Sequence, residues 1–337
     1  MTDIVVFVLA VSLLLYVLLG GADFGAGIVE IFTGKKGSDV ISKAIAPIWE
    51  ANHVWLILVI VILFNGFPQV YSNLTTYLHI PLFIILIGII FRGTAFTFRY
   101  YDTKQDNISI YYTVLFRLSS LLTPFFFGIV LGAIILGKIP STSNGSFFKL
   151  FISPWFNLFS VSTGIFVTFL FAWLASVYLT GEAKDEKTFQ TFVKTSRNFF
   201  IVLVLSGIAV FLMAELDELH FFIKFMHSAI SLSCVIVATL TIPIIWRNIK
   251  LRKRFQTRLW TGIQTACIIL GWFAIQFPVM LAFADGSQFT ISNSQAPERT
   301  ITLLVYALFV GIVIIFPAFI YLFKVFAFEK NEEENAI

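Results

Sequence analysis

Residues 4–19 read IVVFVLAVSLLLYVLL, and residues 20–32 continue as GGADFGAGIVEIF. A bilayer core about 30 Å thick needs roughly 20 apolar helical residues to cross it, and this stretch is long enough. No basic segment precedes it, and it is longer than the apolar core of a secretory signal peptide. We therefore expect it to be retained as a first membrane span.

The rest of the chain has the same character. Hydrophobic residues make up 58% of the 337 residues and charged residues 12%, against about 25% charged in a soluble domain. Backbone groups in lipid must be hydrogen-bonded within the segment, which leaves helices, because the short alternating segments of a closed barrel are absent. The sequence predicts an all-α integral membrane protein with about nine transmembrane helices.

The predicted spans follow from the apolar runs. They cover residues 4–32, 47–70, 78–98, 112–136, 155–179, 198–214, 221–246, 259–283 and 301–326. We expect a single membrane domain over residues 1–337, built as two four-helix bundles plus one further helix. Residues 1–136 would form the first bundle and residues 137–283 the second. Residues 284–337 would supply an outer loop, the last helix and a short acidic tail without structure of its own.

Lysine and arginine residues concentrate in the loops after the first, third, fifth and seventh spans. The positive-inside rule therefore predicts that these loops are cytoplasmic, with the N-terminus outside and the C-terminus inside. Representative positions are Lys35, Lys104, Lys187 and Lys253 on the cytoplasmic side, and Asn73, Asn144 and Ser287 on the other side. Because the basic residues are divided among separate loops, the net charge of +4 does not indicate a nucleic-acid partner.

Charged residues inside a span are costly, so each is a candidate functional residue. The predicted orientation gathers Asp23, Glu50, His53 and Arg92 in the cytoplasmic leaflet. For Asp23 and Arg92 we favour a structural ion pair between two helices over a chemical role. For Glu50 we favour proton conduction, because a partly desolvated carboxylate can exchange protons near neutral pH. His53, three residues further along the same helix, could extend the relay or serve packing, and both readings stay open.

Other residue patterns indicate packing more than chemistry. Gly21 and Gly25 have the G-x-x-x-G spacing that lets helices approach closely in lipid. The two cysteines, Cys234 and Cys267, lie in different apolar runs and are expected to be inert packing residues. No metal-type cysteine spacing occurs, and no metal site is predicted.

Histidines and acidic residues near the outer surface give weaker signals. The four histidines are His53, His79, His220 and His227. Only the second and third could meet at one depth as a haem pair, and both stand at helix ends beside polar residues, so we expect no haem ligand in this chain. The acidic segment 215–218 is expected to be an outer loop, with a cation site as the second reading.

Three segments, in this order, resemble subunit II of cytochrome bd ubiquinol oxidases. They are GGADFGAG at residues 20–27, APIWEANHVWL at residues 46–56 and FRGTAFTFR at residues 91–99. The most specific part is the core formed by Trp49, Asn52 and Trp55, since this string has no general structural reason to exist. Residues 277–303 also resemble the family's last outer loop and last span.

The resemblance implies a heterodimer in the bacterial cytoplasmic membrane. Its larger subunit I would carry haems b and d, oxidise quinol and reduce dioxygen to water with protons drawn from the cytoplasm. Glu50 matches a family position, often Asp, that is associated with a proton pathway, and His53 stands where some members have Gln. The resemblance leaves open a bound quinone or lipid, a small accessory subunit, and membership of the cyanide-insensitive branch.

Two other classes of function compete with this reading. A secondary transporter would also bury charges and bend helices at glycines, although here the charges gather toward one side of the membrane and not at its midplane. A purely structural membrane scaffold is the third class. Purification of the chain with a haem-bearing partner would favour the oxidase, whereas a monomer that moves a solute would favour the transporter.

Overall fold

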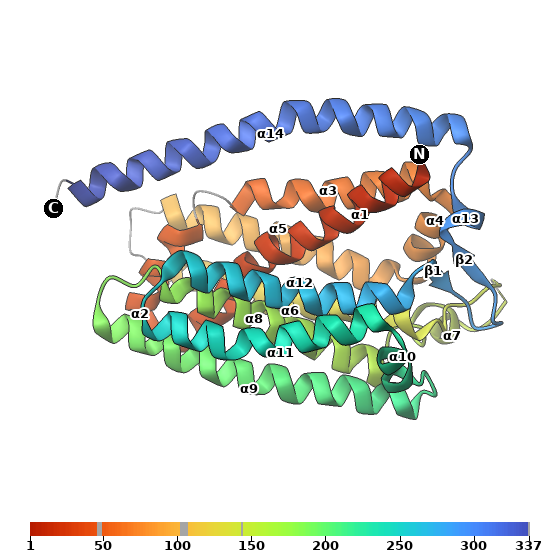
Figure 1. The fold of residues 1–337 in the computed structure, drawn as a ribbon, viewed down its shortest axis with the longest axis horizontal. Helices are drawn as coiled ribbons and strands as arrows, with labels where there is room; N and C mark the ends of the chain where they lie inside the picture. Colours follow the sequence, from red (N-terminus) through yellow and green to blue (C-terminus); the bar gives the residue numbers. More distant parts are fainter. Residues whose placement is uncertain (46–48, 102–106, 143, 336–337) are drawn as a thin grey trace.

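The computed structural model describes residues 1–45, 49–101, 107–142 and 144–335 (Figure 1). Within these residues, nine helices are long and apolar enough to cross a membrane. The predicted all-α membrane architecture is therefore confirmed. Lys104, used for the topology prediction, lies outside the described residues, as do residues 46–48 of the family segment. The direction in which the chain crosses the membrane stays a prediction.

The first span is continuous in sequence but irregular in geometry. It consists of α1 (Thr2–Leu15), a π-helical turn η1 (Tyr16–Gly20) and α2 (Gly21–Ile45). Single π-helical turns inside α-helices are rare, and they frequently occur at functional sites. Farther along, Gly34 has a φ of 68°, a left-handed conformation that glycine adopts without strain, and the helix bends there.

Four helices complete the first half of the molecule. They are α3 (Trp49–Gly66), α4 (Pro68–Tyr77), α5 (His79–Tyr101) and α6 (Asn107–Leu136). The second span was predicted to continue to Val70, which is wrong, because α3 ends at Gly66. Pro68 then starts a separate short helix, since proline fits the first helical turn but cannot donate the hydrogen bond needed in a helix interior.

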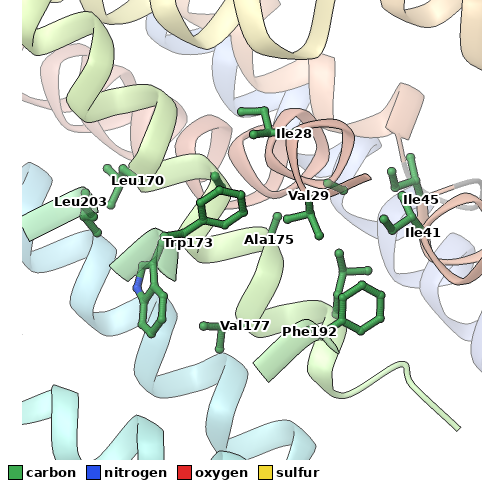
Figure 2. Packing of buried hydrophobic residues seen from close by; sticks show 14 of the residues in the cluster. Ile28, Val29, Ile41, Ile45, Leu170, Trp173, Ala175, Val177, Phe192 and Leu203 are labelled. Atoms are coloured by element: carbon green, nitrogen blue, oxygen red, sulfur yellow. The ribbon is translucent and has the colours of Figure 1, made fainter. Parts of the chain in front are cut away.

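The second half contains α7 (Phe147–Phe151), α8 (Leu158–Thr180), α9 (Glu186–Leu216), α10 (Phe221–His227), α11 (Ala229–Lys250) and α12 (Arg254–Gln276). The central helix is α8, which packs on α2, α6, α9 and α12. Figure 2 shows Trp173 and Val177 of α8 beside Val29 of α2 and Phe192 of α9. The two halves of the chain therefore share one continuous interface along α2, α6 and α8.

The boundaries of two predicted spans in this half were wrong. The sixth span is α9, which begins at Glu186 and not at residue 198. The Asp185 side chain caps this helix by accepting a hydrogen bond from the backbone N–H of Thr188. Basic residues assigned to a loop thus lie on the first turns of a helix. The seventh span is split into α10 and α11 at Ser228, whose hydroxyl caps α11.

A small hairpin replaces the predicted end of the eighth span. Helix α12 stops at Gln276, and β1 (Val279–Ala282) pairs with β2 (Gln288–Thr290) in an antiparallel sheet. The segment around the hairpin also contacts two connections of the first half, since the backbone N–H of Ala284 donates to the carbonyl of Ile139 at 2.9 Å and that of Ala296 donates to the carbonyl of Gly66 at 2.8 Å. The prediction of helix to residue 283 missed the strand because β1 is as apolar as a buried helical segment.

The chain ends in α13 (Ile291–Ser294) and the long helix α14 (Glu298–Asn335). Helix α14 packs on α1 and α3 near its beginning and then diverges from the body of the molecule (Figure 1). Residues 329–335 continue this helix, so the expectation of an acidic tail without structure was wrong.

Candidate functional site

A buried polar cluster lies directly after the π-helical turn, where α2 faces α3 and α5. Asp23 is almost fully buried, and the Asn52 side-chain amide donates a hydrogen bond of 2.8 Å to its carboxylate. The same amide nitrogen lies 3.4 Å from the backbone carbonyl of Leu19, inside the π turn. One residue of the family core, Asn52, therefore connects the carboxylate of Asp23 to the irregular backbone before it.

Arg92 of α5 approaches the same segment from the other side. It is completely buried, and its Nη2 donates to the backbone carbonyl of Asp23 at 3.1 Å and lies 3.9 Å from the carboxylate oxygen Oδ1. Its guanidinium carbon lies 4.9 Å from the centre of the Phe24 ring and 5.4 Å from that of Phe116. A carbonyl, two ring faces and a carboxylate thus offset the cost of burying the cation.

Several polar atoms of this cluster have no hydrogen-bond partner in the described part of the chain. They are Nε and Nη1 of Arg92, the hydroxyl of Tyr16 and Nδ1 of His53. The imidazole ring of His53 lies 6.2 Å, centre to centre, from the rings of both Tyr16 and Phe24. Because buried polar groups in proteins are as a rule hydrogen-bonded, this interior is suited to ordered water.

The two residues of the predicted relay point in different directions. Glu50 is exposed on the surface of the chain, whereas His53 is half-buried against the rings of Tyr16 and Trp49. Three residues correspond to about 300° of helical turn, so the two side chains diverge by about 60°. Among the described residues, no hydrogen bond or ion pair joins Glu50 to His53.

The two tryptophans of the family core have packing environments of their own. The indole of Trp49 packs edge-on to Phe96 with 5.8 Å between ring centres. It also lines an open cleft of about 450 Å³ between α3 and α5, together with Gly93 and Thr97. Trp55 packs partly buried against the cluster that contains Tyr16.

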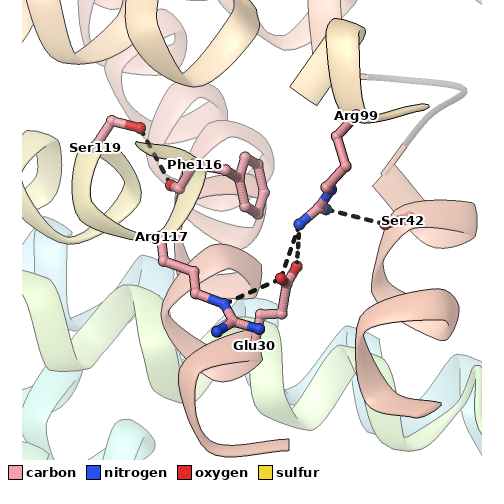
Figure 3. A network of polar contacts seen from close by, with 6 residues as sticks. All are labelled: Glu30, Ser42, Arg99, Phe116, Arg117 and Ser119. Carbon is pink, nitrogen blue, oxygen red and sulfur yellow. Dashed lines mark hydrogen bonds and ion pairs between the residues drawn. The ribbon is translucent and has the colours of Figure 1, made fainter. Parts of the chain in front are cut away.

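Sequence reasoning missed Glu30, whose carboxylate is fully buried (Figure 3). Nη1 of Arg99 donates to both carboxylate oxygens, at 2.8 and 3.0 Å, and Nε of Arg117 donates to Oε1 at 3.2 Å. A signal was available, because Glu30 follows Asp23 by seven residues and Arg99 follows Arg92 by seven. Seven residues are about two helical turns, and the two helices run in the same direction. The spacing therefore predicts a second carboxylate–arginine pair two turns from the first.

The glycines singled out for packing lie where α2 crosses α8. A Cβ atom added to Gly21 would lie 2.9 Å from the Phe171 ring. One added to Gly25 would lie 2.8 Å from Cβ of Ala175 and closer still to the backbone oxygen of Phe171. The absence of side chains at both positions permits the close crossing beside the polar cluster.

His79, His220 and two of the outer acidic residues have local partners. Nδ1 of His79 lies 2.8 Å from the carbonyl oxygen of Thr76. In the segment 215–220, Asp217 pairs with Lys138 at 2.6 Å and Glu215 lies 3.7 Å from His220. In the part of the chain that the structure describes, no three His, Cys, Asp or Glu side chains converge as a metal site.

The sequence is similar to proteins of one family. Residues 1–326 match the model of the family described as cytochrome bd terminal oxidase subunit II. Cytochrome bd ubiquinol oxidase subunit 2 of Bacillus subtilis is 30% identical over 171 residues, which are 50% of this chain and 49% of that protein. Cytochrome bd-I ubiquinol oxidase subunit 2 of Escherichia coli is 27% identical over 172 residues, which are 47% of this chain and 44% of that protein.

These alignments span about half the length of each curated relative. The fold also resembles a chain in the structure of bd oxidase from Geobacillus thermodenitrificans, with a TM-score of 0.77 and 19% identity over 97% of this chain and 98% of that chain. The family model covers nearly the whole sequence. We conclude that the chain belongs to the cytochrome bd terminal oxidase subunit II family.

Proposed function

We propose that this chain is the subunit of a quinol:dioxygen oxidoreductase that ligates no haem and that assembles with a haem-bearing subunit I in the bacterial cytoplasmic membrane. Family membership supports the proposal, as do the names of two relatives, both ubiquinol oxidase subunits. Haems b and d in subunit I would supply the redox chemistry that reduces dioxygen with electrons from quinol. This chain would stabilise that subunit and contribute a route for protons from the cytoplasm.

The observation that carries the proton route is the placement of Glu50. An exposed carboxylate in the first turn of a membrane-spanning helix, at the predicted cytoplasmic end, can exchange protons with water on that side. Because Glu50 faces outward from this chain, the route would begin on the surface of the subunit, where a partner can pack against it. The side chain of His53, one turn deeper, would relay protons inward through bridging water.

The unpartnered buried groups support the inner half of the route. Tyr16, His53 and Arg92 each present at least one hydrogen-bonding atom without a partner among the described residues. Water bound to these atoms would connect them, and proton transfer can pass along such a chain. The Glu50 side chain points outward and the His53 side chain points inward, and the two do not touch. The proposed route therefore needs water to carry the proton from one to the other.

In this proposal Asp23 and Arg92 act as a structural pair. The Arg92 guanidinium holds the backbone of α2 through the Asp23 carbonyl, and Asn52 holds the carboxylate. Together they join three helices at the level of the π turn and thereby keep the interior of the route in place. The open cleft beside Trp49 is the part of this region where a quinone or lipid tail would fit.

A secondary transporter with a buried charged site is the alternative function. The π turn and the bend at Gly34 favour it, because transporters use interrupted helices to build their sites. Purification from membranes distinguishes the two proposals. The oxidase requires a haem-bearing chain in a fixed ratio to this one, whereas the transporter requires solute uptake by liposomes that contain this chain alone.

The proton route is tested by Glu50→Gln, which retains size and hydrogen bonding but removes the titratable proton. We expect the variant complex to contain full haem and to lose most of its quinol-driven oxygen consumption, while Glu50→Asp retains much of it. Glu298→Gln is the matched control, since Glu298 is also an exposed carboxylate in the first turn of a span, at the predicted outer side. Wild-type turnover by Glu50→Gln across neutral pH would remove the basis for the route.

A further inference from the structure

The only two cysteines of the chain lie on neighbouring antiparallel helices. Cys234 belongs to α11 and Cys267 to α12, and the loop between these helices is only three residues long. Both thiols are free and half-buried. Helices α11 and α12 pack closely against each other. Whether the two cysteines lie at the same level is decided by the register of these two helices.

Two hydrogen bonds between the helices define the register around the pair. On one side of it, the Ser231 hydroxyl donates to the backbone carbonyl of Gly271 at 2.8 Å. On the other side, the Gln264 amide donates to the backbone carbonyl of Ala238 at 3.2 Å. The two helices are antiparallel, so one turn forward from Ser231 along α11 corresponds to one turn back from Gly271 along α12. These steps lead to Cys234 and Cys267, which therefore lie at the same level, between the two hydrogen bonds.

The helices also approach closely at this level. A Cβ atom added to Gly271 would lie 3.4 Å from Cβ of Cys234, so only a small residue separates the two backbones there. Disulfide formation requires the Cα atoms of two cysteines to lie roughly 4.4–6.8 Å apart. The paired hydrogen bonds on either side and the absence of a side chain at Gly271 bring the two backbones close together at the level of the cysteines.

We infer that Cys234 and Cys267 form a dithiol that a membrane quinone oxidises to a disulfide between α11 and α12. In this step both S–H bonds break and one S–S bond forms. The two electrons and two protons reduce the quinone to quinol, so atoms and charges balance. The half-buried position of both thiols leaves them open to an oxidant dissolved in the bilayer.

The oxidised form would have a mechanical consequence. The side-chain oxygen Oε1 of Gln264 also accepts a hydrogen bond of 2.9 Å from the indole N–H of Trp173, which lies in the central helix α8. A disulfide one turn from Gln264 would therefore fix α11 covalently to the helix that is anchored to the centre of the molecule. This inference goes beyond the proposed function, and its test does not measure oxygen consumption.

The experiment uses the purified complex in lipid nanodiscs under anaerobic conditions, with decylubiquinone as oxidant. This quinone has no unsubstituted ring carbon, which disfavours addition of a thiol, and the mass of each peptide distinguishes a disulfide from a thioether to the ring. After treatment, the chain is denatured and its free thiols are counted by gel shift with maleimide-polyethylene glycol. We expect the quinone to abolish both labels on the chain and dithiothreitol to restore them, with a peptide crosslink between α11 and α12 in the mass spectrum.

The matched control moves one thiol around its helix by combining Cys267→Ser with Ile269→Cys. Two residues correspond to about 200° of turn, so the new thiol faces away from Cys234 at nearly the same depth. We expect this variant to keep both labels after quinone treatment. The inference is overturned if the unmodified chain keeps both labels, if the control loses them equally, or if the disulfide joins two copies of the chain.

Discussion

The close crossing of α2 and α8 at Gly25 supports a quantitative prediction. In Gly25→Ala the new methyl group would lie 2.8 Å from Cβ of Ala175, whereas ordinary van der Waals contact begins near 3.4 Å. The contact with the backbone oxygen of Phe171 is closer still. Neither neighbour can rotate away, because one is a backbone atom and the other a Cβ fixed to its helix. The helices must therefore separate by more than about 0.6 Å.

The loss in free energy of unfolding caused by Gly25→Ala depends on how tightly this region is packed. Inserting one methyl group into a well-packed interior typically destabilises a protein by about 1–3 kcal/mol, and contact with rigid atoms belongs at the upper end. We expect a loss of about 3 kcal/mol, which is roughly a hundredfold change in the ratio of folded to unfolded protein. The apparent melting temperature should fall by about 4 °C, because an unfolding entropy of about 2.1 cal/mol/K per residue amounts to about 0.7 kcal/mol/K for 337 residues.

Thermal loss of the assembled complex, followed by size-exclusion chromatography after heating, measures this change. Gly311→Ala is the control, because Gly311 lies in α14 with no atom within 4 Å of its added Cβ. Alanine favours helix over glycine, so the control should be neutral or slightly stabilised. A Gly25→Ala complex that melts within about 1 °C of this control, well below the roughly 4 °C expected, would refute the packing argument.

Two further predictions concern the buried cluster and the orientation. Asn52→Leu removes a donor from the buried carboxylate of Asp23 and should cost about 1–3 kcal/mol of stability, whereas Asn65→Leu, at an exposed position of the same helix, should cost little; equal melting temperatures would contradict this. Cysteine introduced at Lys253 should react with a membrane-impermeant maleimide only in inverted vesicles, and cysteine at Asn144 only in intact cells. The opposite pattern would reverse the orientation.

The sequence predicted the depth in the membrane of most candidate site residues, but not the direction in which their side chains point. The order of the spans indicated that Asp23, His53 and Arg92 belong to one leaflet, since depth depends on distance along a helix. It did not indicate that Glu50 faces outward and His53 inward, because one-face periodicity is weak in helices that are apolar all round. Glu30 was overlooked although its seven-residue offset from Asp23 is visible in the sequence.

What the sequence determined by itself is the number of spans and their helical nature, which the described residues confirm with nine candidate membrane helices. Lipid offers backbone groups no hydrogen bonds, so an apolar run of sufficient length has one solution. Only the tertiary structure decided the crossing at Gly25, the partners of Arg92 and the register that brings Cys234 and Cys267 to the same level of neighbouring helices. These depend on which helix faces meet, and between apolar helices that choice is made by close packing and a few polar pairs rather than by hydrophobicity.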